Sequence, residues 1–222
     1  MAAARPRGDE AARVADVKTG PGASDPQPSL EDCLRLIEAV MALEPSVYLF
    51  GGVAEDAMLH GSWVRPHDDI DVLVERADLP RQLENARTLG FGSFETRFQP
   101  LPATPVVVGS IERGLNLEIS VVDRSPDGSP FFYMVDVRAD VIRIEVSDDI
   151  FGYAPCMLDG IEVRTVSPLA QFQIRAGIAM AGGFGPLRAK DVTAQRALQE
   201  RFYPDTPIED LSPTIVPLSE PS

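Results

Sequence analysis

Apolar residues recur along this chain with two different spacings, which together predict helices and strands in a mixed order. From Leu30 to Met41 the apolar residues lie three or four positions apart, as in an amphipathic helix, and Ser29 suits its N-cap. Short apolar runs rich in β-branched residues predict buried strands. These criteria predict helices over residues 30–44, 53–60, 79–89, 168–180 and 188–201, and strands over residues 47–50, 70–74, 106–108, 115–122, 131–135, 141–146 and 161–165.

This order of elements favours an α+β fold, with a mixed β-sheet flanked by helices and a small C-terminal helical part. We expect the sheet-containing domain over residues 29–166 and the helical part over residues 167–211. Residues 1–28 show no apolar periodicity and are rich in Ala, Arg, Gly, Pro and Asp, so they predict a disordered tail. Residues 212–222 hold three prolines and predict a flexible end.

The formal net charge of the 222-residue chain is −14, and all of the excess acid lies beyond residue 28, because acidic and basic residues balance in the tail. An acidic surface repels phosphate backbones and attracts cations, which disfavours a nucleic-acid partner and fits a polycationic small molecule. A local basic groove remains compatible with this global charge, although Lys18 and Lys190 are the only lysines.

Two cysteines, Cys33 and Cys156, form no disulfide framework and no metal-ligand spacing. No stretch approaches membrane-spanning length, and the N-terminus lacks the apolar core of a secretory signal. We therefore expect a cytoplasmic protein without a membrane partner, and the oligomeric state stays open.

The most informative segment is Asp69-Ile70-Asp71, which lies in a predicted strand. Residues two apart in a strand point to the same face, so the two carboxylates lie side by side while Ile70 enters the core. Such a pair is costly unless a cation lies between the carboxylates or one is protonated, and Mg²⁺ is the usual cation where a substrate brings phosphates. A pair of solvated aspartates at a strand edge is the simpler alternative.

Gly51-Gly52 follows a predicted strand directly, and we interpret it as a tight turn. Glycines at such a place let backbone amides approach a phosphate. Between this turn and the aspartates lie Arg65, which could hold a phosphate or pair with a carboxylate, and His67, whose role the sequence leaves open. Each of these features alone also fits an ordinary turn or a polar surface residue.

Two-metal transfer chemistry needs a third carboxylate from another strand. Glu118 lies in the strand predicted over residues 115–122, on the face opposite its alternating apolar residues. It could bind metal or act as the base for an attacking hydroxyl. Asp123, just beyond that strand, is the alternative.

The string from Gly51-Gly52 through Arg65, His67 and Asp69-Ile70-Asp71 resembles the polymerase-beta-like nucleotidyltransferase superfamily, most closely its aminoglycoside 2''-adenylyltransferase and lincosamide nucleotidyltransferase branch. The resemblance is dense over residues 48–74 and loose elsewhere. It implies a nucleotidyltransferase-type sheet, two Mg²⁺ ions and an NTP co-substrate, with ATP favoured. It also implies transfer of a nucleoside monophosphate to a hydroxyl of a small molecule.

Carried over position by position, the resemblance makes Asp69 and Asp71 metal ligands and Gly51 and Gly52 the nucleotide-phosphate turn. Glu118 matches the third acidic position by its strand context. The segment Arg188-Ala189-Lys190-Asp191 resembles the family's Arg-x-Lys-Asp, which implies that Lys190 contacts the triphosphate, as Arg65 could. The chain departs from the family's pattern at Val53 and Ala194, and these departures leave the acceptor open.

Two other functions remain as alternatives. Toxin-type nucleotidyltransferases that act on tRNA use a similar motif but usually have Ser where His67 stands, and they need a basic groove. A catalytically decayed fold serving as a binding module is the second alternative, which the intact carboxylates disfavour.

Overall fold

The computed structural model describes residues 28–96, 107–110, 116–135, 141–180 and 189–217. The expected tail over residues 1–28 therefore falls almost entirely outside the described residues. The helices are α1 (Leu30–Met41), α2 (Gly51–His60), α3 (Leu79–Thr88), α4 (Pro168–Met180), α5 (Ala189–Phe202) and α6 (Ile208–Leu211), with a 3₁₀ turn at Arg76–Asp78. The strands are β1 (Tyr48–Phe50), β2 (Asp69–Glu75), β3 (Ser93–Thr96), β4 (Val107–Ser110), β5 (Asn116–Arg124), β6 (Pro130–Val135), β7 (Val141–Glu145), β8 (Cys156–Leu158), β9 (Ile161–Val163) and β10 (Thr214–Pro217).

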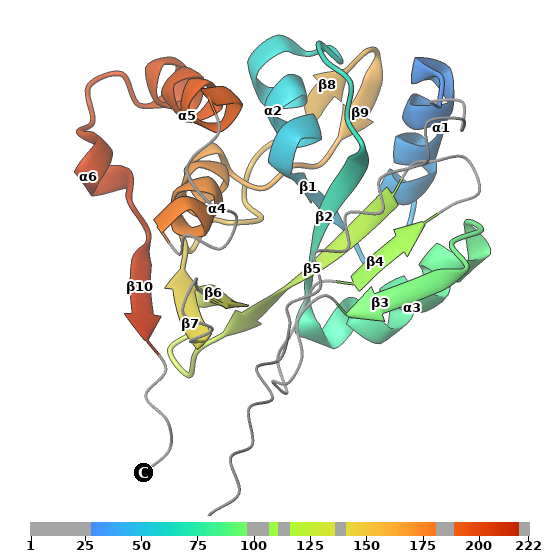
Figure 1. The fold of residues 1–222 in the computed structure, drawn as a ribbon, viewed down its shortest axis with the longest axis horizontal. Helices are drawn as coiled ribbons and strands as arrows, with labels where there is room; N and C mark the ends of the chain where they lie inside the picture. Colours follow the sequence, from blue (N-terminus) through green and yellow to red (C-terminus); the bar gives the residue numbers. More distant parts are fainter. Residues whose placement is uncertain (1–27, 97–106, 111–115, 136–140, 181–188, 218–222) are drawn as a thin grey trace, which may run out of the picture.

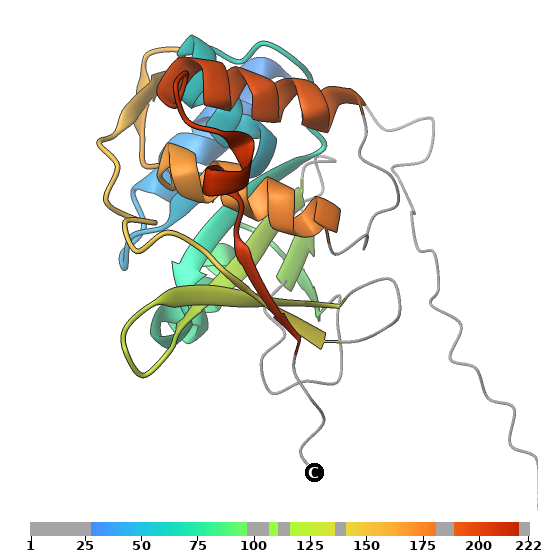
Figure 2. The ribbon, with the colours of Figure 1, turned by 90° about the vertical axis from the view of Figure 1, so that its left-hand side faces the viewer.

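The strands form a mixed eight-stranded sheet in which β1, β2, β5, β6, β7 and β10 are consecutive neighbours, with β4 beside β5 and β3 beside β4. Strand β2 runs parallel to β5, and the other pairs are antiparallel. Figures 1 and 2 show α4 and α5 stacked beside one another near α2, above the sheet. The expected α+β class and its mixed sheet flanked by helices are confirmed.

Strand β5 connects the two halves of the sheet. Its first part pairs with β2 and β4, whereas its last residues, Asp123 and Arg124, pair with β6. Its alternating apolar residues Leu117, Ile119 and Val121 are buried. They join the core that α1, α2 and α3 cover, while Val122 joins a second core under α4. One strand thus fixes both cores relative to each other.

The predicted elements are largely confirmed, with two corrections. The glycines at 51 and 52 do not form a separate turn but are the first two residues of α2. Phe50 is its extended N-cap, and Gly51 has a φ of +69°. The end of the chain is not flexible throughout, since Thr214–Pro217 forms β10 on the edge of β7. Pro213, which is buried, precedes the strand, and Pro217 is its last residue, opposite Ile142 of β7.

The short elements β3, β8 and α6 were not predicted. Strands β8 and β9 form a hairpin around Asp159-Gly160, both with positive φ. An Asp-Gly pair between two apolar runs is a hairpin pattern, so this element had a readable signal. The domain boundary expected near residue 166 stays a prediction.

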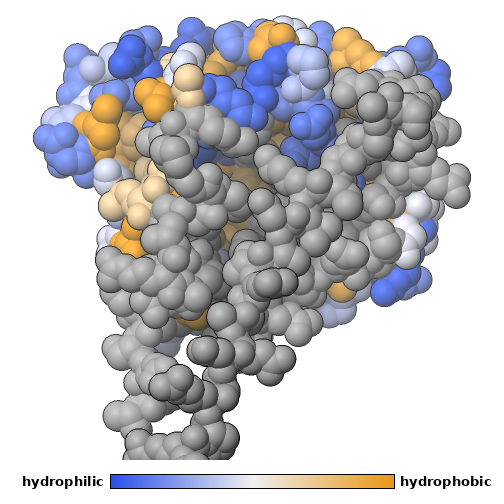
Figure 3. Space-filling model, viewed as in Figure 1, coloured by the Kyte–Doolittle hydropathy of each residue, from blue (hydrophilic) through white to orange (hydrophobic). Residues whose placement is uncertain are grey.

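None of the helices within the described ranges is both long and apolar enough to span a membrane. Exposed large apolar residues are scattered over the described chain, at Leu30, Val64, Met157, Met180, Val192 and Ile208. On the face that Figure 3 shows, the described surface is mostly hydrophilic, with separate apolar spots.

The second core gives a direct test of this architecture. Ile144 is fully buried in it, next to Gly177 of α4. We expect Ile144→Ala to lower the free energy of unfolding by about 2–5 kcal/mol, because it leaves a cavity between sheet and helix. Ile208→Ala, which truncates an isoleucine that is 54% exposed, should change it by less than about 0.5 kcal/mol. Urea unfolding of both variants measures the difference, and equal effects would contradict the assigned packing.

Candidate functional site

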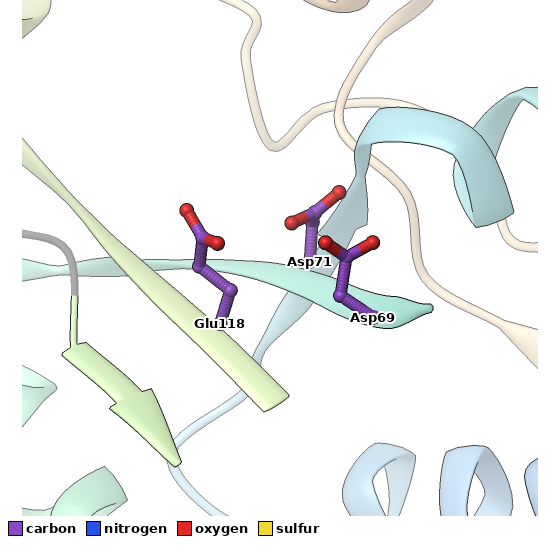
Figure 4. A group of neighbouring side chains, drawn as sticks. All are labelled: Asp69, Asp71 and Glu118. Carbon is purple, nitrogen blue, oxygen red and sulfur yellow. The ribbon is translucent and has the colours of Figure 1, made fainter. Parts of the chain in front are cut away.

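Three carboxylates gather where β2 and β5 run side by side. Asp69 and Asp71 project from one face of β2, and Glu118 stands opposite Asp71 in the β5 register. One carboxylate oxygen of each residue lies within 4.8 Å of the other two, and all three point to the same side of the strands (Figure 4). All three side chains are half-buried. The structure therefore brings the sequence-predicted trio together in one group.

Asp123, the other candidate for the third carboxylate, belongs to a different interaction. It lies five residues further along β5 and accepts hydrogen bonds from Arg76 Nε and, at 2.6 Å, Arg76 Nη2. This hydrogen bonding to Asp123 raises the pKa of the Arg76 guanidinium. Of the two candidates, only Glu118 is a member of the carboxylate group.

Gly51 is required because the first residue of α2 lies against Asp71. A Cβ built at Gly51 would overlap Asp71 Oδ2 and would stand 3.0 Å from its Cγ. The φ of +69° is also a conformation that residues with a side chain rarely adopt. The Gly51 amide donates a 3.0 Å hydrogen bond to Gln171 Oε1. Gly51 thus serves the close approach of Asp71 to the helix, and its N–H already has an acceptor.

Gly52 faces the two polar residues that the sequence placed between the motifs. A Cβ there would lie 2.5 Å from Arg65 Nη2 and 2.7 Å from His67 Nδ1. Arg65 and His67 therefore cover the first turn of α2, whose amides lack partners within the helix. Arg65 Nη2 lies 3.6 Å from Glu55 Oε2, and its side chain is 35% exposed. The guanidinium is thus next to the helix N-terminus and reachable from solvent.

The loop that carries Arg65 and His67 is held by two aspartates. Asp56 Oδ2 accepts hydrogen bonds from Val64 N at 2.9 Å and from His67 Nε2 at 3.0 Å. Asp159, in the β8–β9 hairpin, accepts from Trp63 N at 2.8 Å. The Trp63 ring meets His67 edge-on, with centroids 4.8 Å apart. These contacts give His67 a positioning role within the loop, which the sequence had left open.

Behind the helix lies a buried polar network that was not predicted. Arg175 of α4 binds Glu55 through Nε and, at 2.6 Å, through Nη2, and it binds Asp191 of α5 at 2.7 Å through Nη1. Gln171, one turn before Arg175, donates to Glu55 Oε1 at 2.9 Å. Burial lowers the pKa of Arg175, but the hydrogen bonds and charge of Glu55, then the charges of Asp191 and Asp71, outweigh it and leave the pKa above its ordinary value.

Lys190 occupies the second position of α5, next to Asp191. Its side chain is exposed, whereas Asp191 is buried against Arg175. Successive side chains of a helix point about 100° apart. Lys190 therefore lies on the surface at the N-terminal end of α5. Asp191 attaches the same end of the helix to α4. No described contact joins it to the carboxylate group.

Comparison with solved structures identifies the fold class. Neither a protein-family model nor a curated protein sequence matches the chain. Solved nucleotidyltransferase structures do match it along most of its length, with identities below 20% and TM-scores above 0.5. The chain therefore has a nucleotidyltransferase fold, as the resemblance over residues 48–74 implied.

The matching structures come from the branch that the sequence motif indicated. The lincosamide antibiotic adenylyltransferase LnuA, bound to lincomycin, is 17% identical with a TM-score of 0.54, and the match covers 78% of this chain and 98% of that chain. ANT(2'')-Ia in complex with adenylyl-2''-tobramycin is 18% identical with a TM-score of 0.59, covering 82% and 95%. A solution structure of ANT(2'')-Ia is also 18% identical, with a TM-score of 0.54 and coverage of 74% and 78%.

The contact between Gly51 and Asp71 makes a quantitative prediction. We expect Gly51→Ala to destabilise the protein by more than Gly61→Ala, because both glycines have nearly the same φ, +69° and +68°, but only Gly51 faces a side chain at overlap distance. The backbone penalty alone is about 1–2 kcal/mol, and the displacement of Asp71 adds to it. Chemical denaturation of the two variants checks this, and equal losses would show that Asp71 moves aside freely.

Proposed function

We propose that this protein is a Mg²⁺-dependent nucleotidyltransferase that moves a nucleoside monophosphate from an NTP to a hydroxyl of a small molecule. The observation that carries this proposal is the group of Asp69, Asp71 and Glu118 beside the N-terminus of α2, within a nucleotidyltransferase fold. ATP is the favoured nucleotide, since the solved structures of similar fold are described as adenylyltransferases or hold an adenylylated product.

The three carboxylates fit Mg²⁺ in their chemistry. Mg²⁺ prefers hard oxygen ligands and is usually held by one or two carboxylates together with substrate phosphates. Asp69, Asp71 and Glu118 offer such oxygens within 4.8 Å of one another. When bound, one or two Mg²⁺ ions would neutralise charge on the triphosphate and polarise the α-phosphate.

The residues around α2 supply the other requirements of phosphate binding. The positive end of the α2 dipole and its first-turn amides attract an anion. Gly52 leaves the backbone accessible beneath Arg65, whose guanidinium is suited to a phosphate oxygen. We assign Arg65 and Lys190 to the triphosphate. The Gly51 amide is excluded from this role in the described conformation, because it is bonded to Gln171.

In the proposed reaction, Glu118 takes the proton from the acceptor hydroxyl. The hydroxyl oxygen then forms a bond to the α-phosphorus while the bond from that phosphorus to the bridging oxygen breaks, and pyrophosphate leaves with the electron pair. Asp69 and Asp71 would hold Mg²⁺ beside the triphosphate. The product is the acceptor's nucleoside monophosphate ester.

The acceptor is best sought among cationic antibiotics and related small molecules that carry hydroxyl groups. LnuA was solved with lincomycin and ANT(2'')-Ia with an adenylylated tobramycin. This chain's net charge of −14 also favours cationic compounds over nucleic acids.

The carboxylate assignment is tested by Asp71→Asn against Asp68→Asn. Asp71→Asn should reduce nucleotidyl transfer to background and weaken Mn²⁺ binding, measured by calorimetry, by more than about 100-fold, the upper range for residues that merely support metal ligands. Asp68 is the exposed neighbour of the group, and the matched Asp68→Asn should retain both properties. Unchanged Mn²⁺ affinity in Asp71→Asn would contradict the assignment of Asp71 as a metal ligand.

The reaction itself is tested by incubating the protein with Mg²⁺ and each α-labelled NTP, together with either a panel of aminoglycosides and lincosamides or total tRNA. We expect label from ATP on a small molecule and release of pyrophosphate. Label on tRNA alone would replace the small-molecule proposal by an RNA-modifying one. Absence of transfer together with absence of Mn²⁺ binding would leave a non-catalytic fold.

A further inference from the structure

The buried network of Glu55, Gln171, Arg175 and Asp191 lies outside the residues that contact substrate in the proposed reaction. Its members come from α2 and from α4 and α5, which both follow α2 by more than 100 residues in sequence. Arg65 also approaches Glu55, and the charge of Asp71 acts on Arg175. Two arginines and three acidic residues are thus close together: Arg65, Arg175, Glu55, Asp71 and Asp191. Burial of so many charges is expensive, so an apolar contact would hold these helices together more simply.

The contacts form a continuous chain from the end of α5 to the carboxylate group. Asp191 binds Arg175, and Arg175 binds Glu55 through two nitrogens. Glu55 shares Gln171 with Gly51, whose N–H and C=O both bond to the Gln171 amide, at 3.0 and 3.1 Å. Gly51 in turn lies against Asp71. Each link is a directional hydrogen bond or a close packing contact.

We infer that Arg175 is a positioning residue, which joins the N-terminal end of α5, and with it Lys190, to the first turn of α2 beside Asp71. Its planar guanidinium is suited to this task because it reaches two carboxylates on different helices in one fixed geometry. The inference rests on the proposed function, since it assigns to Arg175 the alignment of the two ends of the triphosphate site.

The first turn of α5 has one side chain directed to Arg175 and one directed to solvent, as this role of Arg175 requires. Asp191 is 8% exposed and turned toward Arg175, while the preceding Lys190 is exposed. Asp191 therefore attaches the first turn of α5 through a charged contact. Leu198, which is fully buried and lies about two helical turns further on, attaches the middle of α5 through an apolar contact. Loss of Asp191 should release the first turn while Leu198 keeps the helix docked.

The inference predicts non-additive effects on nucleotide binding. We would measure the affinity for α,β-methylene-ATP in the presence of Mg²⁺ by calorimetry, in the wild-type protein and in the variants Asp191→Asn, Lys190→Ala and the double variant. Each single variant should weaken binding about tenfold, and the double variant should be no weaker than Lys190→Ala, because Asp191 acts through Lys190. Affinity for Mn²⁺ alone should stay unchanged in Asp191→Asn, which a general loss of structure would not produce.

Variants of Arg175 extend the test to the centre of the network. Arg175→Lys keeps the charge and should retain more nucleotide affinity than Arg175→Met, although it cannot contact both carboxylates in the same geometry. Arg76→Met breaks another arginine–aspartate pair, away from α2, and Glu200→Gln neutralises an exposed acid on α5. Both controls should leave nucleotide affinity unchanged. If Arg175→Met does not fold, the single and double variants of Asp191 and Lys190 still test the inference.

The outcomes separate the two proposals. Additive losses in the double variant, or wild-type nucleotide affinity in Asp191→Asn, would overturn the inference and leave the nucleotidyltransferase proposal intact. If the wild-type protein binds no nucleotide, both proposals fall together. Non-additive losses with unchanged Mn²⁺ affinity would establish the link from α5 to the triphosphate site.

Discussion

The mutual repulsion of three carboxylates is the constraint around which this structure is built. At separations of about 5 Å and an effective dielectric constant of about 20, each ionised pair repels by about 3 kcal/mol before screening by solvent. Native domains are stable by only about 5–15 kcal/mol, so the trio would be a serious liability without compensation. The positive end of α2, Arg175 and, in the proposed function, Mg²⁺ supply that compensation around Asp69, Asp71 and Glu118.

The same constraint explains why glycines begin α2. Only a residue without Cβ lets the helix N-terminus approach Asp71, and only a second such residue leaves room for Arg65 and His67 above the first turn. The loop between α2 and β2 is then fixed by Asp56 from the helix and Asp159 from the β8–β9 hairpin. These hydrogen bonds hold the Arg65 guanidinium and the N-terminus of α2 beside the carboxylate group.

The sequence predicted the carboxylate group better than its surroundings, for a physical reason. Strand alternation alone places Asp69, Asp71 and Glu118 on common faces, and only parallel pairing of β2 with β5 was needed to bring them together. The strand predicted from the sequence ended at residue 122, so the sequence did not place Asp123 on either face. In the structure Asp123 lies within β5 and pairs with Arg76. The metal role of the trio stays a prediction. The network around Arg175 was missed because Glu55 is distant in sequence, although Gln171 and Arg175, four apart in a largely apolar helix, were a readable sign.

Strand β10 carries a consequence for how the molecule behaves at high concentration. It is the last strand on its side of the sheet within the described chain, so its outer edge presents backbone groups that could pair with another copy. Pro213 precedes the strand and Pro217 is its last residue, and proline has no amide hydrogen to donate to an added strand. The prolines that made this segment look unstructured thus disfavour the pairing of a further strand at this edge.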